Sequence, residues 1–142
     1  MKFWDSSAIV PLLVAEANRN RLIALLESDP VMLVWWGTRI ECTSAIARRE
    51  HEGHLGTDDA TIALERLREL AKSWHEVQPT NQMRTIAERL LRTHPLRAAD
   101  SQQLAAAIIA SGREPALLEF VCLDERLITA AQREGFLIKS RI

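Results

Sequence analysis

The chain has 142 residues, of which 47% are hydrophobic and 26% charged, and its formal net charge is −1. This length predicts a single domain, residues 1–142, that can bury a core without disulfide or metal staples. The longest apolar run, residues 8–15, is too short to cross a bilayer, and Asp5 lies where a secretory signal needs apolar residues. We therefore expect a cytoplasmic protein with no membrane association. The net charge alone does not indicate a nucleic-acid-binding protein.

Short apolar runs alternate with helical patterns along the chain. In chain order we expect a strand at 2–4, helices at 8–13 and 19–26, a strand at 31–35, helices from 38 to about 52, from 57 to about 74 and at 83–91, an alanine-rich helix around 104–109, a strand at 120–123, a helix at 125–133 and a strand at 136–138. Strands that alternate with helices pair in parallel and carry helices on both faces. The sequence therefore predicts an α/β/α sandwich with a central parallel sheet of about four strands.

Polar residues mark the starts of several expected helices. Asp5 and Asp124 stand at strand-to-helix junctions, where aspartate is a preferred N-cap. Thr38 and Glu41 fit a capping box, in which a threonine and a glutamate three residues later satisfy each other's backbone N–H groups. Each of these residues therefore has a structural explanation, against which any functional role must be weighed.

Four carboxylates occupy related places in this layout. Asp5 and Asp124 follow strands, and Glu41 and Asp100 lie in the first turns of helices. The carboxyl ends of parallel strands share one edge of a sheet, so these side chains should converge there, and they would repel one another unless a cation or raised pKa values relieved the repulsion. Oxygen ligands without cysteine or histidine favour Mg²⁺ or Mn²⁺. Such a site suits metal-assisted cleavage of a phosphodiester bond.

Other residues near these acids have two open interpretations each. Arg39 and Arg97 lie within about a turn of an acid and can contact phosphate or pair with a carboxylate. Trp35 and Trp36 are adjacent, so in a strand they point to opposite faces, and either core packing or stacking on a base would account for them. The two cysteines, Cys42 and Cys122, have no metal-binding spacing and are interpreted as small buried apolar residues.

Four stretches together resemble the PIN-domain ribonucleases, and in particular the VapC-type toxins of type II (VapBC) toxin–antitoxin systems. They are FWDSSAIVPLL, WWGTRIECTSAIARRE, LRAADSQQLAAAI and FVCLDERLITAAQREGF, and the resemblance covers nearly the whole chain. It implies a PIN-like fold and an endoribonuclease in which Asp5, Glu41, Asp100 and Asp124 bind Mg²⁺ or Mn²⁺. It also implies a homodimer and a VapB-type antitoxin that lies over the groove at the acidic site.

Two further positions are compared with this family. Ser7, two residues after Asp5, matches a hydroxyl position that holds a ligand or a water in place. The family commonly carries threonine or serine two residues before the last aspartate, whereas this chain has Cys122, whose thiol cannot offer the same hydrogen bond. Together with Arg39 and Arg97, Ser7 is a predicted substrate-binding residue.

Two other classes of protein are alternatives. A receiver-type signalling domain also gathers acids at strand ends and carries a lysine after a late strand, as Lys139 does here, but it needs an adjacent acidic pair where Asp5 is followed by two serines. It also leaves Glu41 and Asp100 unexplained. A non-catalytic protein-binding module is the third interpretation, which the loss of one of the four acids would have favoured.

Overall fold

A computed structural model describes residues 1–139, so residues 140–142 of the predicted domain lie outside the described part of the chain. In the described part, five strands form one parallel sheet in the order β3-β2-β1-β4-β5. The strands are β1 (Lys2–Trp4), β2 (Met32–Trp35), β3 (His75–Val77), β4 (Glu119–Val121) and β5 (Leu137–Ile138). That the whole chain forms a single domain stays a prediction.

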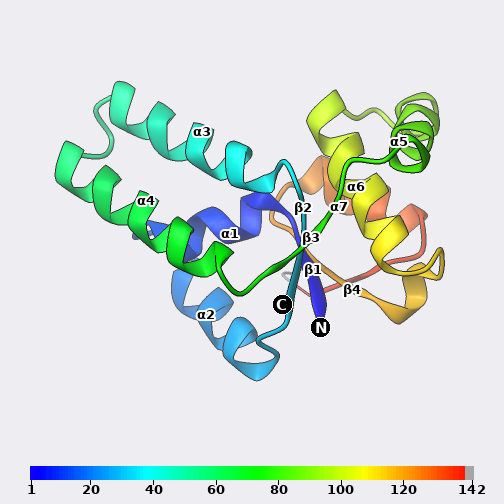
Figure 1. Cartoon of the computed structure of the whole chain (residues 1–142), viewed down its shortest axis with the longest axis horizontal. Coiled ribbons are helices and arrows are strands. Elements are labelled where there is room, and N and C mark those ends of the chain that lie inside the picture. The colour runs from blue at the N-terminus through cyan, green and yellow to red at the C-terminus, as the bar shows by residue number, and fades with distance from the viewer. Residues whose placement is uncertain (140–142) are drawn as a thin grey trace.

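Helices cover both faces of this sheet (Figure 1). Among residues 1–139 the α-helices are α1 (Ser6–Leu13), α2 (Arg19–Ser28), α3 (Thr38–His51), α4 (Thr57–Ala71), α5 (Asn81–Thr93), α6 (Ala98–Ala110) and α7 (Glu125–Arg133). Helices α1 to α4 lie on one side of the sheet and α5 to α7 on the other, and each side has its own apolar core. The predicted α/β/α sandwich is therefore confirmed. None of the helices described here is long and apolar enough to span a membrane.

Successive residues of the central strand β1 face opposite cores. Phe3 packs under α5 to α7, where its ring stacks on that of Phe120 with 5.5 Å between the centroids. Trp4 and Val121 pack under α1 to α4. These four side chains are all fully buried. Burial on both faces explains why apolar residues are consecutive in these strands, at Phe3–Trp4 and Phe120–Val121, instead of alternating with polar ones.

The edge strand β3 is an addition that the local sequence pattern does not predict. Its residues His75 and Glu76 are exposed, and the strand is defined by its parallel pairing with β2. The preceding helix, which we expected to reach about Trp74, ends at Ala71. Trp74 instead buries its ring in the core under α1 to α4. Tertiary pairing, which a hydrophobicity pattern does not contain, therefore decides the structure of this segment.

The strand order reverses between β1 and β4. From β1 the chain moves outward through β2 and β3, and it then returns to place β4 on the other side of β1, followed by β5. In open parallel sheets, ligands bind outside the carboxyl ends of the strands at such a reversal. Asp5 directly follows β1, and Asp124 lies three residues after β4, so both lie beside this position.

A partly buried cluster joins α5 to the end of α7. Glu134 Oε1 accepts a hydrogen bond from Arg89 Nη2 at 2.9 Å, and its Oε2 lies 2.7 Å from Nε2 of the buried His94. Burial raises the pKa of Glu134, but the hydrogen bonds from Arg89 and His94 outweigh it, and the net pKa lies below the ordinary value of 4.5. The ionised carboxylate therefore stabilises the folded state.

We predict that Glu134→Gln lowers the free energy of unfolding by about 1–3 kcal/mol near neutral pH, because it removes a charged acceptor from Arg89 and His94. A carboxyl whose pKa is lowered by folding contributes stability above its unfolded pKa and loses it as the pH falls through the folded value. The difference between wild type and variant in urea unfolding should therefore narrow below about pH 4.5. Glu65→Gln, at an exposed position on α4, is the control. An equal loss of unfolding free energy in Glu134→Gln and Glu65→Gln would contradict the prediction.

Candidate active site

An open hollow of about 650 Å³ lies at the carboxyl edge of the sheet and is called here the acid hollow. All four predicted acids line it, namely Asp5, Glu41, Asp100 and Asp124. Asp5 caps α1 and Asp124 caps α7, whereas Glu41 and Asp100 lie in the first turns of α3 and α6. The structure thus brings the four carboxylates together as expected. Their roles as metal ligands and catalytic groups stay predictions.

Asp5 is 3% exposed and is held by donors from both neighbouring segments. Its Oδ2 accepts hydrogen bonds from the backbone N–H of Ser7 at 3.1 Å and from the Ser7 hydroxyl, and the Cys122 thiol donates to the same oxygen at 3.5 Å. The Ser7 hydroxyl oxygen in turn accepts from the backbone N–H of Leu123 at 2.9 Å. These bonds tie Asp5 to the end of β4. A thiol is a weak donor, so Cys122 supplies a weaker contact than a hydroxyl would.

Glu41 is held by side chains from two other helices, and the predicted capping box with Thr38 is wrong. The helix begins at Thr38 as expected, but its N-cap is Gly37, and no side chain caps it. The buried Thr38 hydroxyl accepts from Gln103 Nε2 at 3.0 Å. The same nitrogen donates to Glu41 Oε2 at 2.8 Å, and the Ser6 hydroxyl donates to Glu41 Oε1 at 3.4 Å. Glu41 therefore lies in the acid hollow with no capping role.

Asp100 and Asp124 combine helix capping with exposure to the acid hollow. Asp100, at the third position of α6, accepts a hydrogen bond from the backbone N–H of Arg97, the N-cap residue. This is the acidic half of a capping box. Asp124 Oδ1 accepts from the backbone N–H groups of Arg126 and Leu127 at 3.0 and 3.1 Å. Capping fixes the orientation of both carboxylates while they line the hollow.

Burial and mutual repulsion raise the pKa of three of these carboxyls. Burial, followed by the negative charge of Asp5, raises the pKa of Glu41 to about 7. Burial is also the main cause that raises the pKa of Asp5, with a smaller contribution from Asp100. The pKa of Asp100 is raised by burial and then by the charge of Asp124, against the opposing charges of two nearby arginines. The hollow therefore holds an excess of negative charge.

The donor set of the acid hollow suits a hard divalent cation. Carboxylate and hydroxyl oxygens are the ligands that Mg²⁺ and Mn²⁺ prefer. A cation would offset the negative charge of Asp5, which after burial is the next cause of the raised pKa of Glu41. Within residues 1–139, however, no group of three or more histidine, cysteine, aspartate or glutamate side chains is arranged as a metal site. The chemistry of the donors thus fits the expected metal, and the ligand assignment stays a prediction.

The three predicted substrate-binding residues take different places around the acid hollow. Ser7 lines it and is bonded to Asp5. Arg97 precedes α6, and its charge acts on Asp100. Arg39 instead lines a neighbouring hollow on another side of α3. The structure therefore groups Ser7 and Arg97 with the acids and separates Arg39 from them, and it leaves their roles in substrate binding as predictions.

Sequence reasoning missed three residues that act on the acids. Ser6 and Gln103 donate to Glu41, and the positive charge of Arg126 opposes the rise in the pKa of Asp100. Gln103 carried a detectable signal, because it lies three residues after Asp100 and therefore on the same face of a helix that is otherwise rich in alanine. Its contact with α3 depends on tertiary packing and left no local signal.

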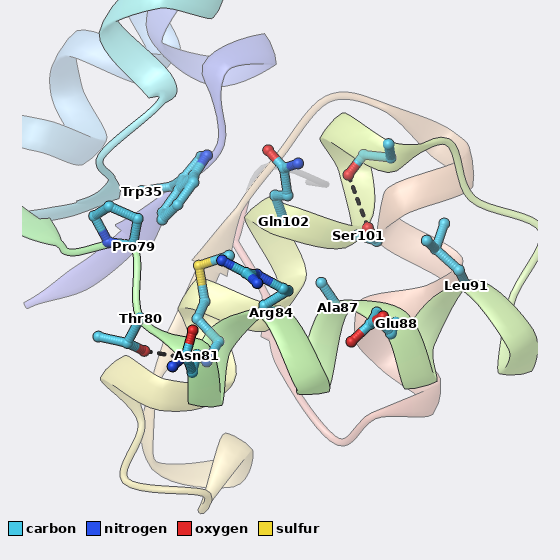
Figure 2. Close-up of a pocket in the computed structure, with 12 residues that line it drawn as sticks. Trp35, Pro79, Thr80, Asn81, Arg84, Ala87, Glu88, Leu91, Ser101 and Gln102 are labelled. Carbon is cyan, nitrogen blue, oxygen red and sulfur yellow. Dashed lines mark hydrogen bonds between the residues drawn. The ribbon is translucent and has the colours of Figure 1, made fainter.

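A second hollow, of about 340 Å³, lies between α5 and the start of α6 (Figure 2). Figure 2 shows Trp35 and Pro79 at one end of it and Leu91 at the other. Its lining includes a single carboxylate, Glu88, and none of the four predicted acids. The first turn of α6 separates the two hollows, because Ser101 faces this one and Asp100 the acid hollow. The acid hollow is therefore the candidate active site.

The structure removes the feature that favoured a receiver domain. Such a domain needs a lysine that reaches the acids at the strand ends. Lys139 instead pairs with Glu119 of β4, with 3.6 Å between Nζ and Oε1, and it does not line the acid hollow. The alternative therefore retains no specific support.

We predict that Glu41→Gln raises the free energy of unfolding of the metal-free protein by about 1–3 kcal/mol at about pH 8. Folding raises the pKa of this carboxyl from 4.5 to about 7, so ionisation destabilises the folded state as the pH rises through this interval. The gain should shrink toward zero as the pH falls to about 4.5, where the carboxyl is protonated in the folded state. Thermal unfolding in EDTA measures this gain in the free energy of unfolding. Glu50→Gln, on the same helix, is the control. A variant less stable than wild type at both pH values would contradict the prediction.

Comparison with known proteins places the fold. No protein-family model and no curated protein sequence matches the chain significantly. Among solved structures, VapC20 of Mycobacterium tuberculosis, a toxin that cleaves the sarcin–ricin loop, superposes with a TM-score of 0.70 at 19% identity, over 96% of this chain and 97% of that one. FitAcB from Neisseria gonorrhoeae superposes with a TM-score of 0.67 at 19% identity, over 97% of this chain and 96% of that one. FitAB bound to the IR36 DNA fragment superposes with a TM-score of 0.67 at 18% identity, over 98% of this chain and 94% of that one. The chain thus has, over nearly its full length, the PIN-domain fold of these proteins.

Proposed function

We propose that this protein is an Mg²⁺- or Mn²⁺-dependent endoribonuclease that cleaves phosphodiester bonds of RNA and is neutralised by a VapB-type antitoxin. The observation that carries the proposal is the gathering of Asp5, Glu41, Asp100 and Asp124 in one open hollow, at the strand-order reversal of a parallel sheet. Clustered oxygen donors of this kind support metal-assisted hydrolysis of phosphodiesters. A non-catalytic protein-binding module would have no use for four carboxylates that repel one another.

In this proposal the four carboxylates would hold the cation. A bound cation would supply polarisation of a phosphate oxygen and a lower pKa of water. The remaining residues keep the carboxylates in place. Ser7 and Cys122 orient Asp5, and Ser6 and Gln103 orient Glu41. Second-layer contacts of this kind commonly decide metal affinity.

The likeness to known toxins supports the substrate and partner classes. VapC20, which shares the fold, cleaves the sarcin–ricin loop, and this supports RNA as the substrate. The resemblance of the sequence to VapC-type toxins supports a VapB-type antitoxin, a homodimer and a cytoplasmic location. Ser7, Arg39 and Arg97 are the proposed contacts to the substrate.

We predict that the purified wild-type protein cleaves total RNA in Mg²⁺ or Mn²⁺, and that EDTA abolishes the cleavage. Asp5→Asn and Asp100→Asn should reduce cleavage to background, because each substitution removes a charge from the proposed cation site. Asp59→Asn, at an exposed position on α4, is the matched control and should cleave like wild type. Equal cleavage by all four proteins, or cleavage that resists EDTA, would refute the proposal.

We also predict that Gln103→Met, which keeps the side-chain length and removes both donors, lowers cleavage about 10- to 100-fold. Gln103 holds Glu41 through a 2.8 Å hydrogen bond, so its loss should also raise the Mg²⁺ concentration needed for half-maximal activity. Gln102→Met is the control, because Gln102 lines the other hollow. If the two variants had the same Mg²⁺ requirement, Gln103 would have no positioning role.

A further inference from the structure

Trp36 is a large aromatic side chain that is held at the surface. It is 45% exposed, whereas the neighbouring Trp35 is 6% exposed, and the two rings meet edge to face with centroids 6.3 Å apart. The backbone N–H of Trp36 donates to the carbonyl of Val77 at 3.0 Å, which continues the pairing of β2 with β3. A Cβ at Gly37 would lie 2.5 Å from Trp35 Nε1, so only glycine allows Trp35 to pack here. The backbone of Trp36 is thus held by strand pairing, and its exposed ring rests edge-on against the buried ring of Trp35.

Trp36 borders a hollow of about 600 Å³ on the outer side of α3, called here the Trp36 hollow. Ile40 and Ser44, one turn apart on α3, line both this hollow and the acid hollow. The two hollows therefore meet along one helix ridge. Because they share these two lining residues, the hollows are immediate neighbours on the surface.

One guanidinium and one carboxylate line the Trp36 hollow, and they differ in their partners. Arg39 lines it, is exposed, and makes no side-chain hydrogen bond or ion pair with any residue from 1 to 139. The one carboxylate in the lining, Glu76, accepts a hydrogen bond from Trp74 Nε1 at 3.0 Å. The hollow therefore offers an aromatic ring, an apolar side chain at Ile40 that is 63% exposed, and an available guanidinium.

We propose that Trp36, Ile40 and Arg39 form a subsite that stacks a base of single-stranded RNA beside the acid hollow, with Arg39 on the adjoining phosphate. Aromatic rings next to an arginine are the usual platform for single-stranded nucleic acid, because every base has a face that can stack. The shared ridge connects this subsite to the proposed site of cleavage. The inference rests on the proposed endoribonuclease function and adds to it the means by which the strand is held.

The test measures binding by fluorescence anisotropy in EDTA, which prevents metal-dependent cleavage. The probes are a labelled oligoadenylate of about ten nucleotides and an abasic ribose-phosphate strand of the same length. Trp36→Ala should weaken binding of oligoadenylate about 5- to 150-fold and leave binding of the abasic strand unchanged. Trp36→Phe should restore most of the affinity, and Trp36→Leu should not. Arg39→Ala should weaken both probes and reduce the slope of log affinity against log salt by about one.

Ile62→Ala, at a 44% exposed apolar position on α4, is the control and should bind like wild type. The subsite is overturned if Trp36→Ala binds oligoadenylate as tightly as wild type does. If the wild-type protein cleaves RNA with Mg²⁺ in the same series, the endoribonuclease function is unaffected by that result. Light scattering tests whether a second copy of this chain covers the hollow instead. A molar mass below that of wild type for Trp36→Ala, together with a wild-type mass for Trp36→Leu, would assign the hollow to that second copy and would also overturn the subsite. A wild-type protein that neither cleaves nor binds RNA would refute the function and the subsite together.

Discussion

Repulsion among four carboxylates at one edge of a parallel sheet is the constraint on which the local structure depends. Parallel strands end at the same edge, and α1, α3, α6 and α7 each have one of the four acids at the N-cap or in the first turn. Helix N-termini carry partial positive charge, which offsets part of the repulsion. The offset is incomplete, since the pKa of Glu41 is raised to about 7 by burial and by Asp5. The fold therefore concentrates negative charge at a point where it cannot fully neutralise it.

The neighbouring side chains hold this unfavourable arrangement together. Ser7 bonds both to Asp5 and to the backbone after β4, and Gln103 bonds both to Glu41 and to the buried Thr38. Each links a carboxylate to a different element of the fold, so the acids cannot move apart without breaking contacts elsewhere. A core optimised only for stability would not contain such a cluster. Raised carboxyl pKa values of this kind cluster at functional sites, which is why the acid hollow is the candidate site.

The sequence predicted those features that follow from local chemistry. Asp5 and Asp124 were predictable because an aspartate between an apolar strand and a helix both caps the helix and lies at the carboxyl edge. The edge strand β3 was not predictable, since its residues are mostly exposed and its structure comes from pairing with β2. The capping box failed for a related reason. Glu41 takes its donors from Ser6 and Gln103, which are distant in sequence, and no local pattern encodes those contacts.

The arginines of α3 are distributed between the two hollows that meet along it. Arg48 lines the acid hollow and Arg39 the Trp36 hollow, and neither guanidinium has a hydrogen-bonding or ion-pair partner within residues 1–139. Arg49, by contrast, pairs with Glu16. The two available arginines thus lie on either side of the ridge formed by Ile40 and Ser44. Under the proposed function, a strand that crosses this ridge would pass one arginine on each side of it, and this positive charge would offset part of the repulsion between its phosphates and the carboxylates.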